Sequence, residues 1–220
     1  MSLIFGIDEA GRGSIIGPLV IVGVAINSLD EDKLKKINVK DSKLLSKTQR
    51  ENLYSQILSI SKDYKIIVIS PSEIDDAVNK KENLNLNWLE AIKSAMIINS
   101  LNPSKVIIDC PSTNIITYKN FISEHILNIE TEFQIEHKAD LNYPVVSAAS
   151  IIAKVTRDAE IEKIKMDIGI DIGSGYPSDP TTINFLKENY LKYAHIIRKS
   201  WMTYKRLISN ESQKQLGEFG

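Results

Sequence analysis

The chain has 220 residues, enough for one good-sized domain that buries its own core. Hydrophobic residues make up 43% and charged residues 25%, as in a globular protein, and the formal net charge of −1 lacks the basic excess typical of nucleic-acid binders. One cysteine and three histidines exclude an internal disulfide and a cysteine-rich zinc finger. We expect a reducing, cytoplasmic compartment, with no membrane span and no secretory signal.

The hydrophobic periodicity predicts alternating strands and helices. In chain order these are strand 3–8, strand 18–26, helix 46–60, strand 64–69, helix 84–98, strand 105–109, helix 115–127, strand 129–136 and helix 144–166. A loop rich in Gly, Pro, Ser and Asp follows at 169–180, and the rest reads as helical with a polar tail after about residue 209. Mixed strands and helices predict an α/β layer fold.

Two of these elements carry specific local signals. Ser46 followed by Gln49 is a capping-box pattern for the start of a helix. In the segment 129–136, Ile129, Thr131, Phe133 and Ile135 alternate with polar residues, which predicts a half-buried strand near a sheet edge.

Four acids stand at positions where a sheet edge would gather them. Asp8 and Glu9 end the first strand, Asp109 ends the strand at 105–109, and Asp140 precedes the long helix. Adjacent strand residues point to opposite faces, so Asp8 and Glu9 share a site only if the backbone turns off at Glu9. Clustered carboxylates favour a hard divalent cation such as Mg²⁺ or Mn²⁺, and two such ions hydrolyse phosphodiesters. A single strand-end Asp is otherwise more often a turn former or helix cap.

The glycine-rich loop at 11–17 reads Gly-Arg-Gly-Ser-Ile-Ile-Gly. It has neither the spacing nor the following helix of a dinucleotide fingerprint, and no Gly-Lys-Ser/Thr of a phosphate-binding loop follows. We interpret it as a loop whose main-chain amides approach a ribose or phosphate, with Arg12 adding a charged contact.

Several blocks of the chain closely resemble ribonuclease HII, in particular its archaeal branch. They begin with Gly-Ile-Asp-Glu-Ala-Gly-Arg-Gly at 6–13 and continue with Asp-Ser-Lys at 41–43, His-Lys-Ala-Asp at 137–140, Gly-Ser-Gly-Tyr-Pro at 173–177 and Arg-Lys-Ser-Trp at 198–201. The blocks span nearly the whole chain in the family's order. One departure is Ser14, where the family usually has proline.

The resemblance implies a fold and a reaction. The fold is an RNase H-like mixed sheet flanked by helices, with a catalytic domain at 1–180 and a helical segment and polar tail at 181–220. The reaction is metal-dependent cleavage of RNA in RNA/DNA hybrids, and cleavage on the 5′ side of ribonucleotides embedded in DNA. The implied catalytic and metal-binding carboxylates are Asp8, Glu9, Asp109 and Asp140. The implied substrate contacts are Gly11, Arg12, Gly13 and Tyr176 at the ribonucleotide's 2′-hydroxyl, and Lys43 at a phosphate.

The C-terminal segment suggests a partner. Residues 213–220, Gln-Lys-Gln-Leu-Gly-Glu-Phe-Gly, resemble a sliding-clamp-binding box without its last aromatic residue, although a disordered polar end is an equal reading. We expect a monomer. Two other functions stay open at this point: a nucleic-acid-binding module without catalysis, and a nucleotide-binding transferase or oxidoreductase that uses the glycine loop.

Overall fold

The computed structural model describes residues 3–39 and 45–217, without the side chains of residue 82 and of residues 210–217. The chain forms two compact units. The first unit comprises Met1–Ala10, Val20–Val68 and Leu86–Arg157, and the second comprises Gly11–Leu19, Ile69–Asn85 and Asp158–Gly220. These units are groups of mutually contacting segments, and the domain division at residue 180 stays a prediction.

The first unit contains a five-stranded mixed sheet in the order β3-β2-β1-β4-β5. The strands are β1 (Leu3–Ala10), β2 (Leu19–Asn27), β3 (Asp63–Ile69), β4 (Lys105–Asp109) and β5 (Glu132–Glu136). β1 pairs antiparallel with β2 and parallel with β4, and β4 pairs parallel with β5. The parallel strands β1 and β4 therefore bring their carboxyl ends to one edge of the sheet.

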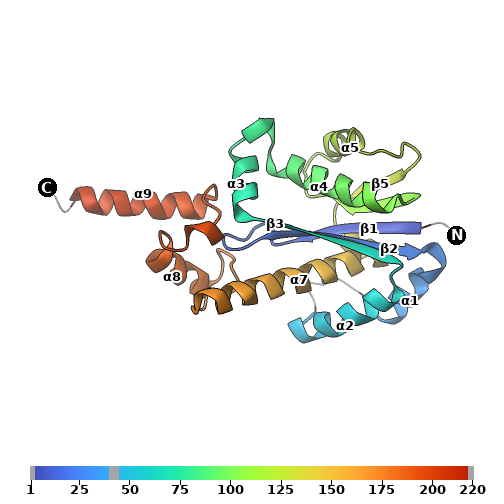
Figure 1. Cartoon of the computed structure of the whole chain (residues 1–220), viewed down its shortest axis with the longest axis horizontal. Coiled ribbons are helices and arrows are strands. Elements are labelled where there is room, and N and C mark those ends of the chain that lie inside the picture. Colours follow the sequence, from blue (N-terminus) through green and yellow to red (C-terminus); the bar gives the residue numbers. More distant parts are fainter. Residues whose placement is uncertain (1–2, 40–44, 218–220) are drawn as a thin grey trace. The chain divides into compact units, whose positions relative to one another are not determined.

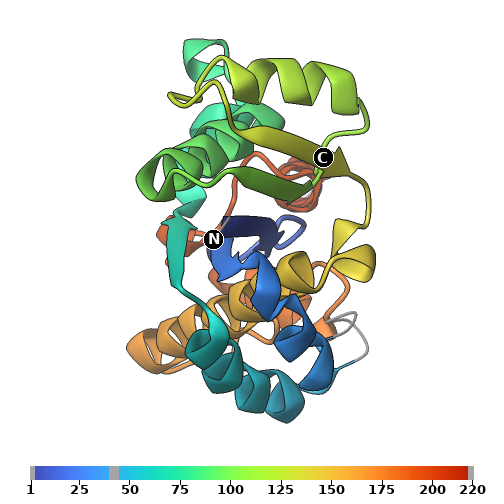
Figure 2. The same cartoon turned by 90° about the vertical axis from the view of Figure 1, so that its right-hand side faces the viewer.

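Helices cover both faces of this sheet. α4 (Leu86–Leu101) and α5 (Ile115–Ser123) lie on one side (Figures 1 and 2). α1 (Glu31–Lys36), α2 (Lys47–Ile60) and the first part of α7 (Pro144–Ile168) lie on the other. The short helix α6 (Ala139–Asn142) precedes α7. The apolar core of this second face joins residues of β2, α2 and α7: Val22, Val24, Leu53, Ile57, Val146 and Ala149. The expected α/β architecture is confirmed.

A glycine allows the central strand to lie very close to α7. A Cβ atom at Gly6 would lie 2.5 Å from both the backbone carbon and the backbone oxygen of Val145. Real Cβ atoms do not approach other atoms so closely, so only glycine fits there without a backbone shift. This close approach sets the distance between β1 and the beginning of α7, two residues before Asp8.

The second unit has its own core. Its helices are α3 (Pro71–Val78), α8 (Pro180–Asn189), α9 (Met202–Gly217) and the last part of α7, with 3₁₀ turns at Lys81–Asn83 and Ala194–Ile196. A 3₁₀ turn at Ser28–Asp30 belongs to the first unit. Buried side chains from the glycine loop and the C-terminal segments pack together, among them Ile15, Ile16, Ile161, Ile172, Phe185 and Leu186. The described part of α9 continues to Gly217, beyond the expected start of the polar tail.

One predicted strand begins later than expected. β5 starts at Glu132, and Ile129 is 93% exposed and lies outside the sheet. A turn at Asn128 explains the difference, because the Asn128 carbonyl accepts from the Thr131 N–H and its side-chain oxygen accepts from the Glu130 N–H. This local side-chain hydrogen bond stabilises a turn at residues where the alternating pattern predicts a strand. The later residues behave as predicted, since Thr131 and Ile135 are buried.

The other predicted elements agree with the structure to within a few residues, whereas the short helices α1, α3 and α6 were not predicted. The capping box of α2 is present, with the Ser46 hydroxyl accepting from the Gln49 N–H and the Gln49 side chain accepting from the Ser46 N–H. None of the helices described is long and apolar enough to cross a membrane.

Candidate active site

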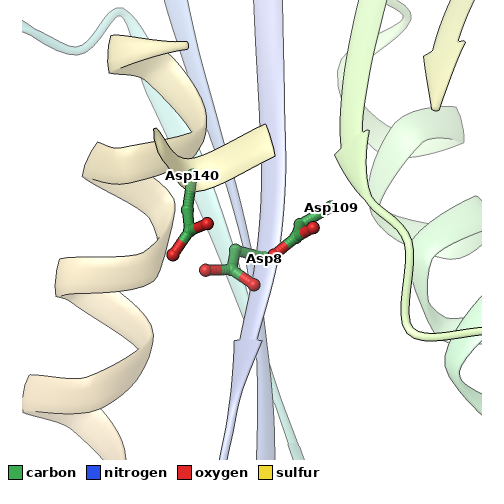
Figure 3. A group of neighbouring side chains, drawn as sticks. All are labelled: Asp8, Asp109 and Asp140. Atoms are coloured by element: carbon green, nitrogen blue, oxygen red, sulfur yellow. The ribbon is translucent and has the colours of Figure 1, made fainter. Parts of the chain in front are cut away.

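Three aspartates meet at the edge of the sheet in the first unit. Asp8 lies in β1, Asp109 ends β4 and Asp140 lies in α6 (Figure 3). Each offers a carboxylate oxygen, and these oxygens all lie within 4.8 Å of one another. Asp8 is 5% and Asp140 3% exposed, so two of the three carboxyl groups are held almost out of water.

The sheet register brings the first two aspartates together. Ile7 of β1 and Ile108 of β4 are partners in a parallel pair, so the next residues, Asp8 and Asp109, lie at the same level on neighbouring strands. In parallel strands, residues at the same level point to the same face. Their carboxylates therefore face the same side of the sheet.

A left-handed residue turns the chain so that Asp140 reaches the other two carboxylates. Lys138 adopts φ 58° just before α6, a conformation that costs a residue with a side chain on the order of 1 kcal/mol. The next N–H, of Ala139, donates to Asp109 Oδ1 at 3.2 Å. This hydrogen bond ties the start of α6 to the end of β4.

The environment of Asp8 favours its neutral form when no cation is present. The pKa of Asp8 is raised from 3.8 to about 7 by burial and by the nearby charges of Asp109 and Asp140, and hydrogen bonds from Ser150 and the Glu9 backbone partly offset this rise. The Glu9 N–H donates to Asp8 Oδ1 at 2.7 Å. A bound cation beside such a buried carboxyl group would lower its pKa and stabilise its ionised form.

This donor set fits a hard divalent cation. Carboxylate oxygens bind Mg²⁺ at about 2.1 Å, so two oxygens on one ion lie no more than about 4.2 Å apart. The observed limit of 4.8 Å is larger by about half an ångström, which small side-chain rotations can close. No comparable group of three His, Cys, Asp or Glu side chains occurs elsewhere among the residues described.

Glu9 is not a member of this group of three. The strand does not turn at Glu9: β1 continues to Ala10, and Glu9 pairs with Ile21 of β2. The negative charge of Glu9 is felt on the α5 side, where burial first and the charges of Glu90 and Glu9 next raise the pKa of Tyr118. The condition under which Asp8 and Glu9 would share a site is therefore not met in this structure, and the role of Glu9 stays a prediction.

Sequence reasoning missed two α7 residues beside Asp8. Ser150 is buried and hydrogen-bonds to the Asp8 carboxylate, and the Lys154 ammonium donates to the Ser150 hydroxyl at 3.2 Å. The sequence did offer a sign of this pair, because Ser150 and Lys154 lie one helical turn apart on the predicted helix. Ser150 also stands among small and apolar residues. The Lys154 ammonium is therefore linked to the Asp8 carboxylate through the Ser150 hydroxyl.

The expected substrate-contacting residues lie in the second unit. Gly11 has φ 86°, which favours glycine, and the following turn is closed by hydrogen bonds from the Ser14 N–H and hydroxyl to the Gly11 carbonyl at 3.2 and 2.8 Å. The Gly175 carbonyl accepts from the Ile15 and Ile16 N–H groups. The glycine loop and the loop of the half-buried Tyr176 are therefore joined. Lys43 lies outside the described residues.

The chain resembles proteins of one known family over nearly its whole length. The family model described as Ribonuclease HII matches residues 5–204. A curated Ribonuclease HII from Pyrococcus furiosus is 47% identical over 96% of this chain and 93% of its own length.

Two solved structures resemble the chain over most of its length. A ribonuclease H2 from Pyrococcus horikoshii has a TM-score of 0.85 and 41% identity, covering 94% of this chain and 98% of that chain. The RNase HII of a PCNA:RNase HII complex from Archaeoglobus fulgidus has a TM-score of 0.80 and 40% identity, covering 93% of this chain and 96% of that one. The chain belongs to the ribonuclease HII family of metal-dependent ribonucleases.

Proposed function

We propose that this chain hydrolyses the RNA strand of RNA/DNA hybrids and cuts on the 5′ side of ribonucleotides embedded in duplex DNA. The observation that carries the proposal is the group of three carboxylates, Asp8, Asp109 and Asp140, with oxygens within 4.8 Å of one another. Such a group suits phosphodiester hydrolysis with two divalent cations, Mg²⁺ or Mn²⁺. Family membership supports the choice of an RNA/DNA substrate.

In the proposed reaction, Asp8, Asp109 and Asp140 hold the cations, and Glu9 is the fourth carboxylate that the family resemblance assigns. When bound, the cations activate the attacking water and stabilise the leaving oxygen. Water adds to the phosphorus on the 5′ side of the ribonucleotide, and the bond from that phosphorus to the 3′ oxygen of the preceding nucleotide breaks. The products carry a 3′-hydroxyl and a 5′-phosphate.

The chain's own residues prepare the carboxylates for this task. The Ser150 hydroxyl and the Glu9 N–H both hydrogen-bond to Asp8 and so favour its ionised form. Lys154 holds the Ser150 hydroxyl from the other side. Asp8 must give up its proton before it can bind a cation, so its pKa of about 7 makes cation binding compete with protons near neutral pH.

We assign recognition of the ribonucleotide to Gly11, Arg12, Gly13 and Tyr176. The 2′-hydroxyl is both a donor and an acceptor, and it distinguishes RNA from DNA. Main-chain amides of a glycine loop suit such contacts, because no side chain blocks their approach. Lys43 completes the assignment as a phosphate contact.

We further propose that residues 213–220 bind a sliding clamp. The related RNase HII from Archaeoglobus fulgidus was solved in a complex with PCNA, which supports a partner of that kind. Deletion of residues 212–220 should abolish binding to the clamp, measured by surface plasmon resonance, and leave cleavage rates unchanged. Clamp affinity equal to that of the full chain would refute this part of the proposal.

The cleavage proposal is tested with a DNA duplex that carries one ribonucleotide, beside an all-DNA duplex and a long RNA/DNA hybrid. The expected result is a single cut 5′ of the ribonucleotide in Mg²⁺ or Mn²⁺, none in chelator, and an intact DNA control. Cleavage of the long hybrid alone would remove the junction-recognition role of Gly11–Gly13 and Tyr176. Binding of both substrates without cleavage would instead favour a non-catalytic binding module.

A further inference from the structure

We propose that Arg198 is a positioning residue that sets the orientation of the Arg12–Gly13 peptide and thereby aims the Gly13 N–H at the substrate. This inference rests on the proposed function, because it explains how the glycine loop of the second unit is made ready for a 2′-hydroxyl. Arg198 is fully buried, with 0% exposure, although arginine is among the residues least often buried. A buried guanidinium needs a specific reason.

The Arg198 side chain contacts both ends of the glycine loop. Its Nη1 donates to the Arg12 carbonyl at 2.9 Å, and its Nε and Nη2 donate to the Gly17 carbonyl at 3.1 and 3.0 Å. The guanidinium carbon lies 5.0 Å from the ring centre of Trp201. One rigid, planar group therefore fixes two carbonyls that are five residues apart in the chain.

The backbone around Arg198 keeps the side chain in register with the loop. The Arg198 N–H donates to the Ile15 carbonyl at 2.9 Å, and the Gly17 N–H donates to the Ile196 carbonyl at 2.9 Å. Ile16 and Ile197 form an antiparallel bridge between these two bonds. The loop cannot slide along Arg198 without losing these backbone hydrogen bonds as well.

Fixing the Arg12 carbonyl also fixes the next N–H. In a trans peptide the carbonyl and the following N–H point in opposite directions, and the described residues contain no cis peptide bond. Because the Arg12 carbonyl points at Arg198, the Gly13 N–H points away from it. Gly13 is exposed, and nothing lies within 4 Å of the position that a Cβ would occupy. An amide oriented in this way is open to a ligand oxygen.

Lysine cannot reproduce this arrangement. It offers a point charge on a flexible stem, whereas the observed contacts need separate N–H groups at the spacing of a planar fork. Methionine keeps much of the side-chain length but offers no donor. It also removes the buried charge, but it leaves the Arg12 and Gly17 carbonyls without their side-chain donor, which costs stability if they stay buried. The two variants together separate lost orientation from a failure to fold.

The test compares Arg198→Lys and Arg198→Met with Leu186→Ala, a matched control that truncates a 1% exposed side chain in the core of the same unit. Thermal unfolding ranks the three variants by stability. Steady-state kinetics on the one-ribonucleotide duplex gives kcat/KM, and the Gly13 amide resonance in ¹⁵N-labelled protein reports the peptide orientation directly.

We expect Arg198→Lys and Arg198→Met to lose about tenfold or more in kcat/KM beyond any loss in Leu186→Ala, as for one missing hydrogen bond to a polar group. The Gly13 resonance should shift in both Arg198 variants and stay in place in Leu186→Ala. Wild-type kcat/KM in either folded Arg198 variant, or an unmoved Gly13 resonance, would overturn the inference. If the wild-type protein does not cut this duplex, the proposed function fails, and the Gly13 resonance alone decides whether Arg198 orients the peptide.

Discussion

Replacing Asp8 by asparagine should stabilise the protein when no metal is present, and by more at high pH than at low pH. Asp8 is buried, and burial together with the charges of Asp109 and Asp140 raises its pKa from 3.8 to about 7. Asparagine keeps the shape of the side chain and its acceptor for the Glu9 N–H, but it carries no charge to bury.

The sign of the pH effect follows from comparing Asp8 in the folded and unfolded chain. Below pH 3.8 the carboxyl is protonated in both states. Between about pH 4 and 7 the unfolded chain releases its proton while the folded chain keeps it, so wild-type stability falls as the pH rises through this window. Above pH 7 Asp8 is ionised in both the folded and the unfolded chain, so wild-type stability falls no further. Each pH unit is about 1.4 kcal/mol, so the whole change is about 4 kcal/mol.

The assay is urea unfolding in chelator at pH 4, 6 and 8. The stability gained by Asp8→Asn should grow by about 4 kcal/mol from the lowest to the highest pH. Asp63→Asn is the matched control, because the Asp63 carboxylate is exposed and accepts from the next residue's N–H at 2.7 Å, as Asp8 does. Added Mg²⁺ should stabilise the wild-type protein at pH 8 and so reduce the difference in unfolding free energy between it and Asp8→Asn. Parallel pH curves for wild type and Asp8→Asn would refute the reasoning.

Further substitutions test the site and the fold around it. Asp140→Asn should lower kcat about a hundredfold or more with little change in substrate Kd, measured by single-turnover cleavage and fluorescence anisotropy, and an unchanged kcat would remove Asp140 from the catalytic set. Ser150→Ala should move the acidic limb of the pH–rate profile upward, because the lost hydroxyl no longer lowers the Asp8 pKa; an unmoved limb would argue against this contact. Gly6→Ala should destabilise the protein by about 2–3 kcal/mol, since the new Cβ would lie 2.5 Å from the Val145 backbone. Equal urea midpoints would contradict that close approach.

Much of the fold could be predicted from the sequence, because its helices and strands are long and regular. The strands at β1, β2 and β4 end on or near the predicted residues, and the Ser46 capping box marks the start of α2. The predicted start of β5 was wrong, because the turn at Asn128 forms where the alternation of apolar and polar side chains predicts a strand. Periodicity alone does not reveal such a local hydrogen bond.

The site was readable only in part. Asp8, Asp109 and Asp140 were all named from the sequence, but only Asp8 and Asp109 are brought together by neighbouring strands. The approach of Asp140 depends on the left-handed Lys138, which no periodic pattern predicts. The roles of Ser150 and Arg198 depend on contacts between distant segments, such as the hydrogen bond from Arg198 to the Gly17 carbonyl. Tertiary contacts of this kind are not encoded in local sequence spacing.

The central claim is that Asp8, Asp109 and Asp140 hold the divalent cations that cleave RNA. The most direct test is anomalous diffraction from a crystal of the protein soaked in Mn²⁺ with an uncleavable RNA/DNA duplex. We predict anomalous peaks within about 2.5 Å of oxygens of all three aspartates, and their loss in Asp8→Asn. Peaks bound only elsewhere on the protein, or peaks that persist unchanged in Asp8→Asn, would contradict the account.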